Sequence, residues 1–179
     1  VEYFELPVAF DALTVVMNPK NAFLKQITVE ELKKIWEPAA QGKVTRWNQV
    51  NPAWPDAPIK LFGAGADSGT FDYFTEAING EEGASRTDFT PSEDDNVIVQ
   101  GVAGSKGGLG YFGFTYYEEN ADKVNAVQID SGDGCVTPSV QSAQDGTYTP
   151  LARPLLVYPS LEALKSNPAF ASFLTYYVE

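Results

Sequence analysis

The chain of 179 residues contains no histidine and only one cysteine, Cys135. A lone cysteine cannot form a disulfide within the chain, and without histidine the commonest general base and metal ligand is missing. The sequence therefore excludes hydrolytic triads and zinc sites that depend on imidazole. It also lacks any apolar run near the roughly 20 residues that span a bilayer. We expect no direct membrane insertion, no metal site and no cofactor.

Basic residues are also few, because 12 Lys and Arg stand against 24 Asp and Glu, which gives a net charge of −12. Such a chain repels nucleic acid and anionic membrane surfaces. An anion bound by this protein would have to be held by local geometry, against the overall field. The hydrophobic content of 44% and the length still predict one domain with a substantial core.

The residues that are present alternate between strand and helix patterns, as in α/β proteins. An apolar, β-branched run predicts a buried strand at 11–17, and Thr28 with Glu31 forms a capping box that starts a helix at 29–37. We expect further helices at 71–79, 115–122 and 168–177, and a capped helix that Ser92 and Asp95 indicate. We also expect a strand from 59, strands at 109–114, 126–129 and 155–158, a loop at 80–91, and a loop with one helical turn at 130–150.

Residues 59–70, Ile-Lys-Leu-Phe-Gly-Ala-Gly-Ala-Asp-Ser-Gly-Thr, have the pattern of a strand that turns through a glycine-rich loop into a helix. Small residues allow a ligand to approach the backbone, and Ser68 and Thr70 can donate hydroxyls beside free N–H groups. The dipole of the helix also favours negative charge at this end. The pattern predicts an anion site. A plain strand–turn–helix junction capped by Ser68 would have the same sequence, so that alternative stays open.

Several segments, in the same order, resemble one family of proteins. They are Ile27–Ile35 (ITVEELKKI), Gly42–Asn48 (GKVTRWN), Asp67–Thr70 (DSGT), Val99–Val102 (VQGV) and Leu109–Gly113 (LGYFG). These segments are spread over nearly the whole chain. They resemble the substrate-binding proteins of ABC phosphate transporters. Those proteins have two lobes of the type II periplasmic-binding-protein fold. The resemblance implies a three-layer α/β lobe with a central mixed sheet flanked by helices.

The resemblance also implies a function and a site. In this family the Ser-Gly-Thr loop grips the anion with hydroxyls and backbone amides, which assigns phosphate binding to Ser68, Gly69 and Thr70, with Asp67 beside them. Members of this family serve phosphate uptake by ABC transporters, which implies inorganic phosphate as the ligand, a membrane permease as a partner and no catalysis. It also implies a periplasmic or extracellular cell-surface location, although this chain has no signal peptide.

Two departures from the family pattern affect this assignment. Family members are usually about twice as long, so residues 1–179 resemble a single lobe, with 1–10 and 150–158 near the crossings to a first lobe that is absent here. Many relatives also place an arginine beside the loop, where this chain has only apolar residues and glycine. Arg86 is the nearest basic residue downstream and the remaining candidate for a bidentate contact to two phosphate oxygens.

An acceptor in the site would distinguish phosphate from sulfate. Near neutral pH inorganic phosphate carries at least one proton, whereas sulfate is fully ionised and is repelled by an acceptor. Asp67 is the candidate acceptor in this lobe. The alternatives are that Asp67 caps the helix or orients Arg86 through an ion pair, and that Arg86 is a solvated loop residue.

Other patterns have simpler explanations. Glu93-Asp94-Asp95 and the 130–134 turn suggest a calcium site, but the turn lacks the alternating acidic ligands and the closing Glu of an EF-hand loop. Both segments fit solvated acidic loops. Two further function classes stay open for the chain as a whole. One is a structural or protein-interaction domain that no longer captures solute, and the other is a phosphatase that uses the loop as an anion cradle, for which no nucleophile with its base is evident.

Overall fold

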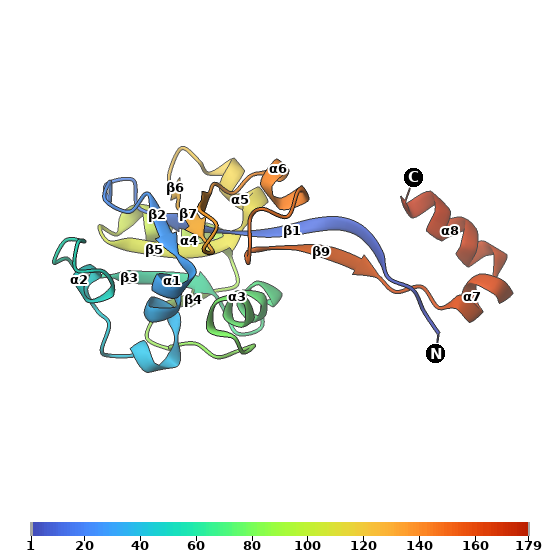
Figure 1. Ribbon diagram of the computed structural model, residues 1–179, viewed down its shortest axis with the longest axis horizontal. Coiled ribbons are helices and arrows are strands. Elements are labelled where there is room, and N and C mark those ends of the chain that lie inside the picture. Colours follow the sequence, from blue (N-terminus) through green and yellow to red (C-terminus); the bar gives the residue numbers. More distant parts are fainter. Residues whose placement is uncertain (1, 179) are drawn as a thin grey trace. The chain divides into compact units, whose positions relative to one another are not determined.

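A six-stranded mixed sheet organises the computed structural model, which describes residues 2–178 (Figure 1). Its strands run in the order β4 (Thr90–Ser92), β3 (Lys60–Ala64), β5 (Gly108–Gly113), β1 (Leu6–Met17) and β6 (Asn125–Ala126), and β9 (Ala152–Val157) also pairs with β1. β3 is parallel to β4 and β5, whereas β1 is antiparallel to β5 and β6. Because three neighbouring strands are parallel, their carboxyl ends lie at one edge of the sheet.

Two apolar cores cover the two faces of this sheet. Along β1 every residue from Ala12 to Met17 is buried, and Val15 and Val16 belong to different cores because successive side chains point to opposite faces. Helices α1 (Val29–Trp36) and α3 (Gly69–Asn79) contribute to the larger core, and α4 (Asp95–Gly104) contributes to the smaller one. This arrangement gives the three layers expected from the sequence.

An aromatic cluster fixes α1 and α3 against the sheet. The ring of Tyr111 on β5 stacks on Phe74 of α3 with centroids 3.7 Å apart, and meets Trp36 of α1 edge-on at 5.1 Å. On the neighbouring strand β3 a Cβ at Gly63 would lie 2.7 Å from Tyr111 Cε1. Glycine at 63 therefore lets the ring of Tyr111 lie close to the backbone of β3.

The remaining elements are short. A second sheet contains β2 (Gln26–Thr28), β7 (Gln128–Asp130) and β8 (Cys135–Val136). The short helices are η1 (Pro38–Ala40), α2 (Trp47–Val50), α5 (Phe114–Glu119) and α6 (Val140–Gln144). Across the part of the chain that the structure describes, no helix has both the length and the apolar content required to cross a membrane.

The described chain divides into two compact units. The larger unit is Ala12–Ala152, and the smaller one combines residues up to Asp11 with those from Arg153 onward. The smaller unit contains α7 (Leu161–Ser166) and α8 (Pro168–Val178). Its helix α8 has one buried residue, Leu174, while Tyr176 is 82% exposed.

The predicted fold class, an α/β fold with a central mixed sheet flanked by helices, is confirmed. The capping box of α1 is present, because Thr28 Oγ1 accepts a hydrogen bond of 3.1 Å from the N–H of Glu31, whose carboxylate accepts from the N–H of Thr28 at 3.0 Å. Helix α3 ends at Gly80, which takes the left-handed conformation with φ 88°. Local signals of this kind need no tertiary context.

Several local predictions are wrong where an element depends on its neighbours. The predicted loop at 80–91 contains the start of β4, a strand held by pairing with β3. The predicted strand at 126–129 is two strands, β6 and β7, in different sheets. The predicted loop at 130–150 contains the strand β8, which was not expected, and α6, which is the expected helical turn. The cap of α4 is Asp94, which lies between the predicted Ser92 and Asp95, and the short helix α7 has no counterpart in the prediction.

Candidate functional site

Two loops meet at the edge where the parallel strands end. The loop after β3 leads into α3, and the loop after β4 leads into α4, so both helices begin at this edge; in Figure 1, α3 lies just beyond the arrowhead of β3. The N–H of Gly65 donates to the carbonyl of Ser92 at 3.2 Å, which holds the two loops side by side. Ligands of open α/β sheets bind at such carboxyl edges, and the predicted anion loop lies here.

The loop presents unused hydrogen-bond donors. Ser68 is the N-cap of α3, its Oγ accepts from the N–H of Thr70 at 3.2 Å, and its own N–H donates to the carbonyl of Gly65 at 3.1 Å. Within residues 2–178, the N–H groups of Asp67 and Gly69 and the hydroxyl of Thr70 have no acceptor. An anion would meet these groups first and would compete with the cap for the N–H of Thr70.

Gly69, the first residue of α3, is not required by the fold. Its φ is not positive, and no heavy atom lies within 4 Å of the position that a Cβ would take. Neither backbone conformation nor internal packing therefore demands glycine here. A remaining physical reason for glycine at this position is that it lets a ligand approach the backbone closely.

The side chain of Asp67 is exposed and makes no hydrogen bond or ion pair with any residue that the structure describes. Ser68 occupies the cap position, and Arg86 pairs with Asp88. Neither of the alternative roles for Asp67, helix cap or partner of Arg86, is therefore found. Its carboxylate remains available to a ligand.

Arg86 is a buried structural residue with a side chain only 4% exposed. Its Nη1 donates to the carbonyls of Ile35 and Val44, each at 3.0 Å, and its Nε and Nη2 donate to the carboxylate of Asp88 at 2.5 and 2.9 Å. Every guanidinium nitrogen is thus engaged inside the protein. This environment is not the solvated loop position that was one alternative for Arg86.

Arg86 lies at the far end of α3 from the anion loop. Asn79, the last residue of α3, donates to the carbonyl of Trp36 at 3.3 Å, and the N–H of Arg86 donates to the same carbonyl at 3.1 Å. The 11 residues of α3, at about 1.5 Å each, place its ends about 16 Å apart. The structure does not bring Arg86 together with Asp67, Ser68, Gly69 and Thr70, so its predicted contact to an anion has no support in this geometry.

The hydrogen bonds from Arg86 also control the ionisation of Asp88. They lower the pKa of this carboxyl group to about 2, and a hydrogen bond from the N–H of Gly42 adds to the effect. Asp88 is therefore ionised at neutral pH. Its charge compensates the buried guanidinium, which would be costly to leave unpaired.

The acidic residues at the start of α4 have separate roles. Asp94 caps the helix, its Oδ1 accepting from the N–H of Asn96 at 2.9 Å, and burial together with the nearby charge of Asp94 raises the pKa of Asp95. In the described part of the chain no three acidic or cysteine side chains are grouped to hold a metal ion.

Glu93 is a residue of this edge that sequence reasoning missed. Its side chain lies across Gly65, where a Cβ would collide with Glu93 Oε1. The contact follows from the register of β3 and β4, which pairs Ala64 with Ser92 and makes the next two residues neighbours. The available signal was the acidic residue directly after Ser92, but the sequence does not show that this segment pairs with β3.

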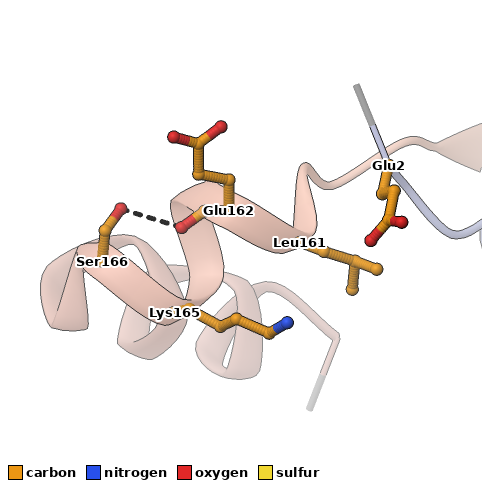
Figure 2. Close-up of a pocket in the computed structure, with 5 residues that line it drawn as sticks. All are labelled: Glu2, Leu161, Glu162, Lys165 and Ser166. Carbon is orange, nitrogen blue, oxygen red and sulfur yellow. Dashed lines mark hydrogen bonds between the residues drawn. The ribbon is translucent and has the colours of Figure 1, made fainter.

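A hollow of about 440 Å³ belongs to the smaller unit. It is lined by Glu2, Leu161, Glu162, Lys165 and Ser166. Figure 2 shows Lys165 and Leu161 extending toward Glu2, while the carboxylate of Glu162 points away from them. The hydroxyl of Ser166 donates to the backbone carbonyl of Glu162 at 2.8 Å. None of these residues belongs to the predicted anion loop.

Comparison with known proteins identifies the family. The PBP superfamily domain matches residues 2–179, so the chain belongs to the PBP superfamily. The chain is 54% identical over 178 residues to Protein SphX of Synechocystis sp., covering 99% of this chain and 53% of SphX. It is 37% identical over 180 residues to the phosphate-binding protein PstS of Staphylococcus saprophyticus, covering 100% of this chain and 54% of that protein. The chain thus spans about half the length of these curated relatives.

Solved structures agree with this family. A possible phosphate-binding protein from Planctomyces limnophilus is 50% identical, with a TM-score of 0.91 over 98% of this chain and 62% of that chain. A candidate phosphate ABC transporter substrate-binding protein from Clostridium perfringens, solved with bound phosphate, is 26% identical, with a TM-score of 0.69 over 96% of this chain and 65% of that chain.

Proposed function

We propose that this chain is one lobe of a substrate-binding protein that delivers inorganic phosphate to an ABC transporter. The observation that carries the proposal is the N-terminus of α3, where the N–H groups of Asp67 and Gly69 and the hydroxyl of Thr70 have no acceptor among the described residues. Such a set of donors at a helix N-terminus suits a compact anion. Relatives that are named as phosphate-binding proteins support phosphate as that anion.

The residues that we assign to phosphate are Asp67, Ser68, Gly69 and Thr70. The backbone of Asp67 and Gly69 and the hydroxyls of Ser68 and Thr70 supply donors, and the exposed carboxylate of Asp67 supplies an acceptor for a proton on phosphate. Arg86 was a further candidate, but its engaged guanidinium assigns it to the fold. The net charge of −12 makes these short-range contacts, not the overall field, responsible for binding.

A further lobe would complete the site. The chain spans about half of its curated relatives, and the smaller unit exposes large apolar side chains on α8. We place the crossings to this other lobe near 1–10 and 150–158. The function is then capture without catalysis, in the periplasm or at the cell surface, with the permease of the transporter as the partner.

Phosphate should shift the backbone amide resonances of Ser68, Gly69 and Thr70 before any others, because those groups line the start of α3. Thr70→Ala should weaken phosphate binding by about 1–2 kcal/mol, the cost of one hydroxyl contact to a charged ligand, and leave the fold intact. An NMR titration of both proteins measures the two effects. Shifts confined to a distant patch would instead support the structural or interaction domain, and equal affinity of Thr70→Ala would leave Thr70 no part in binding.

Gly69→Ala tests whether a ligand rests on the backbone. Alanine is a better helix former than glycine, and open space surrounds the new methyl group, so the free energy of unfolding should stay the same or rise by up to about 1 kcal/mol. The same methyl group would stand between an anion and the N–H groups, so phosphate affinity should fall about tenfold or more. Urea unfolding and NMR titration measure the two quantities. Unchanged affinity would remove Gly69 from the site.

A further inference from the structure

The loop after β4 places a carboxylate against the backbone of the proposed phosphate loop. Gly65 directly follows β3 and Glu93 directly follows β4, and the hydrogen bond of 3.2 Å from Gly65 N–H to the carbonyl of Ser92 continues the pairing of these strands. The side chain of Glu93 lies over Gly65, because a Cβ there would be 2.8 Å from Glu93 Cδ and would collide with Oε1.

This carboxylate lies over the loop that leads into α3. The N–H of Ser68, the N-cap of α3, donates to the carbonyl of Gly65 at 3.1 Å, so the residue under Glu93 is hydrogen-bonded directly to the start of the helix. Glu93 therefore contacts the same loop that carries the unused donors of Asp67 and Gly69.

The carboxylate of Glu93 is also unused. Its side chain is exposed and forms no hydrogen bond or ion pair with the residues that the structure describes. The fold thus keeps glycine at 65 and leaves the space above it to a charged group without an internal partner. Among the described residues, no contact of the Glu93 carboxylate explains why it is placed here. A contact with a bound ligand would explain it.

Building on the proposed function, we propose that Glu93 is a second proton acceptor of the anion site and makes the site select oxyanions that carry a proton. The O–H of hydrogen phosphate can donate to the carboxylate of Glu93, whereas sulfate has no proton at neutral pH and is repelled. Asp67, on the other loop, is the first acceptor. Together the two carboxylates match the two protons of dihydrogen phosphate.

Glu93→Gln tests this role in the 179-residue chain. Glutamine keeps the shape of the side chain, removes its charge and adds an N–H₂ group that can donate to sulfate. Titrations with inorganic phosphate and with sodium sulfate, at equal ionic strength and followed at the amides of 68–70, give the ratio of the two affinities. The preference for phosphate should fall about tenfold or more in Glu93→Gln.

Two further variants separate position from charge. Gly65→Ala leaves the charge unchanged but displaces the carboxylate, so it should also reduce the preference for phosphate. Glu82→Gln removes an equal charge from an exposed residue beyond the C-terminal end of α3 and should leave the preference unchanged.

The outcomes distinguish the two proposals. If phosphate leaves the amides of 68–70 unmoved in the unmodified chain, the proposed function fails and the role of Glu93 fails with it. If phosphate moves them but Glu93→Gln keeps the preference of the unmodified chain, the role of Glu93 is overturned and phosphate binding stands.

Discussion

The 179-residue chain on its own should bind inorganic phosphate only weakly, with a dissociation constant on the order of millimolar. In a two-lobed binding protein each lobe contributes donors, and closure removes the anion from water. With one lobe the anion stays partly hydrated, and the contacts at Asp67, Gly69 and Thr70 act at a higher dielectric constant. A loss of about 4 kcal/mol corresponds to roughly a thousandfold in affinity, which takes a dissociation constant near micromolar in an intact two-lobed protein to about millimolar in one lobe.

Isothermal titration calorimetry of the isolated chain measures this affinity. Sedimentation at the same concentrations serves as the control, because a dimer that rebuilt the site would bind more tightly than one lobe. Submicromolar binding by a monomer would contradict the single-lobe proposal, since the site would then be complete within these residues.

Arg86→Ala should lower the free energy of unfolding by about 3–5 kcal/mol, because it removes a buried ion pair and leaves the carbonyls of Ile35 and Val44 without their donor. Urea unfolding measures the change. Arg46→Ala is a matched control, because Arg46 pairs with Asp56 on the surface, where such a pair contributes less than about 1 kcal/mol. Normal stability of Arg86→Ala combined with lost phosphate shifts would instead make Arg86 a ligand.

Asp88→Asn tests the same pair through its pH dependence. The pKa of Asp88 is lowered from 3.8 to about 2 in the folded state, so the stability it contributes is complete above pH 3.8 and is lost as the pH falls toward 2. Because the carboxylate is 36% exposed, this contribution is only about 1 kcal/mol. Asp88→Asn should remove that part of the acid unfolding curve, and an unchanged curve would contradict the shift.

Local signals explain why much of the fold could be predicted. The capping box at Thr28 and Glu31 and the apolar run from Ala12 to Met17 act over a few residues, so the sequence alone places α1 and the inner part of β1. The role of Arg86 could not be predicted in this way. Its acceptors are backbone carbonyls 51 and 42 positions away, and a carbonyl leaves no residue-specific signal.

The same difference between local signals and tertiary contacts applies to the candidate site. Glycines and hydroxyl residues near Ser68 predict an anion loop, and the structure places this loop at the carboxyl edge of the sheet. Glu93 escaped prediction because its position depends on the register of β3 with β4. The three residues of β4 are too few to show a strand pattern, so their pairing exists only in the folded protein.

The free donors at the start of α3 include two main-chain groups, the N–H of Asp67 and that of Gly69. Substitution of a side chain does not delete a main-chain N–H, except where proline replaces the residue. These main-chain donors are kept when Asp67 is substituted, as long as the backbone conformation is unchanged and the space above Gly69 stays open. Anion binding could therefore persist in relatives whose loop sequence has diverged. The selectivity among anions could change separately, through substitutions of the neighbouring acidic side chains.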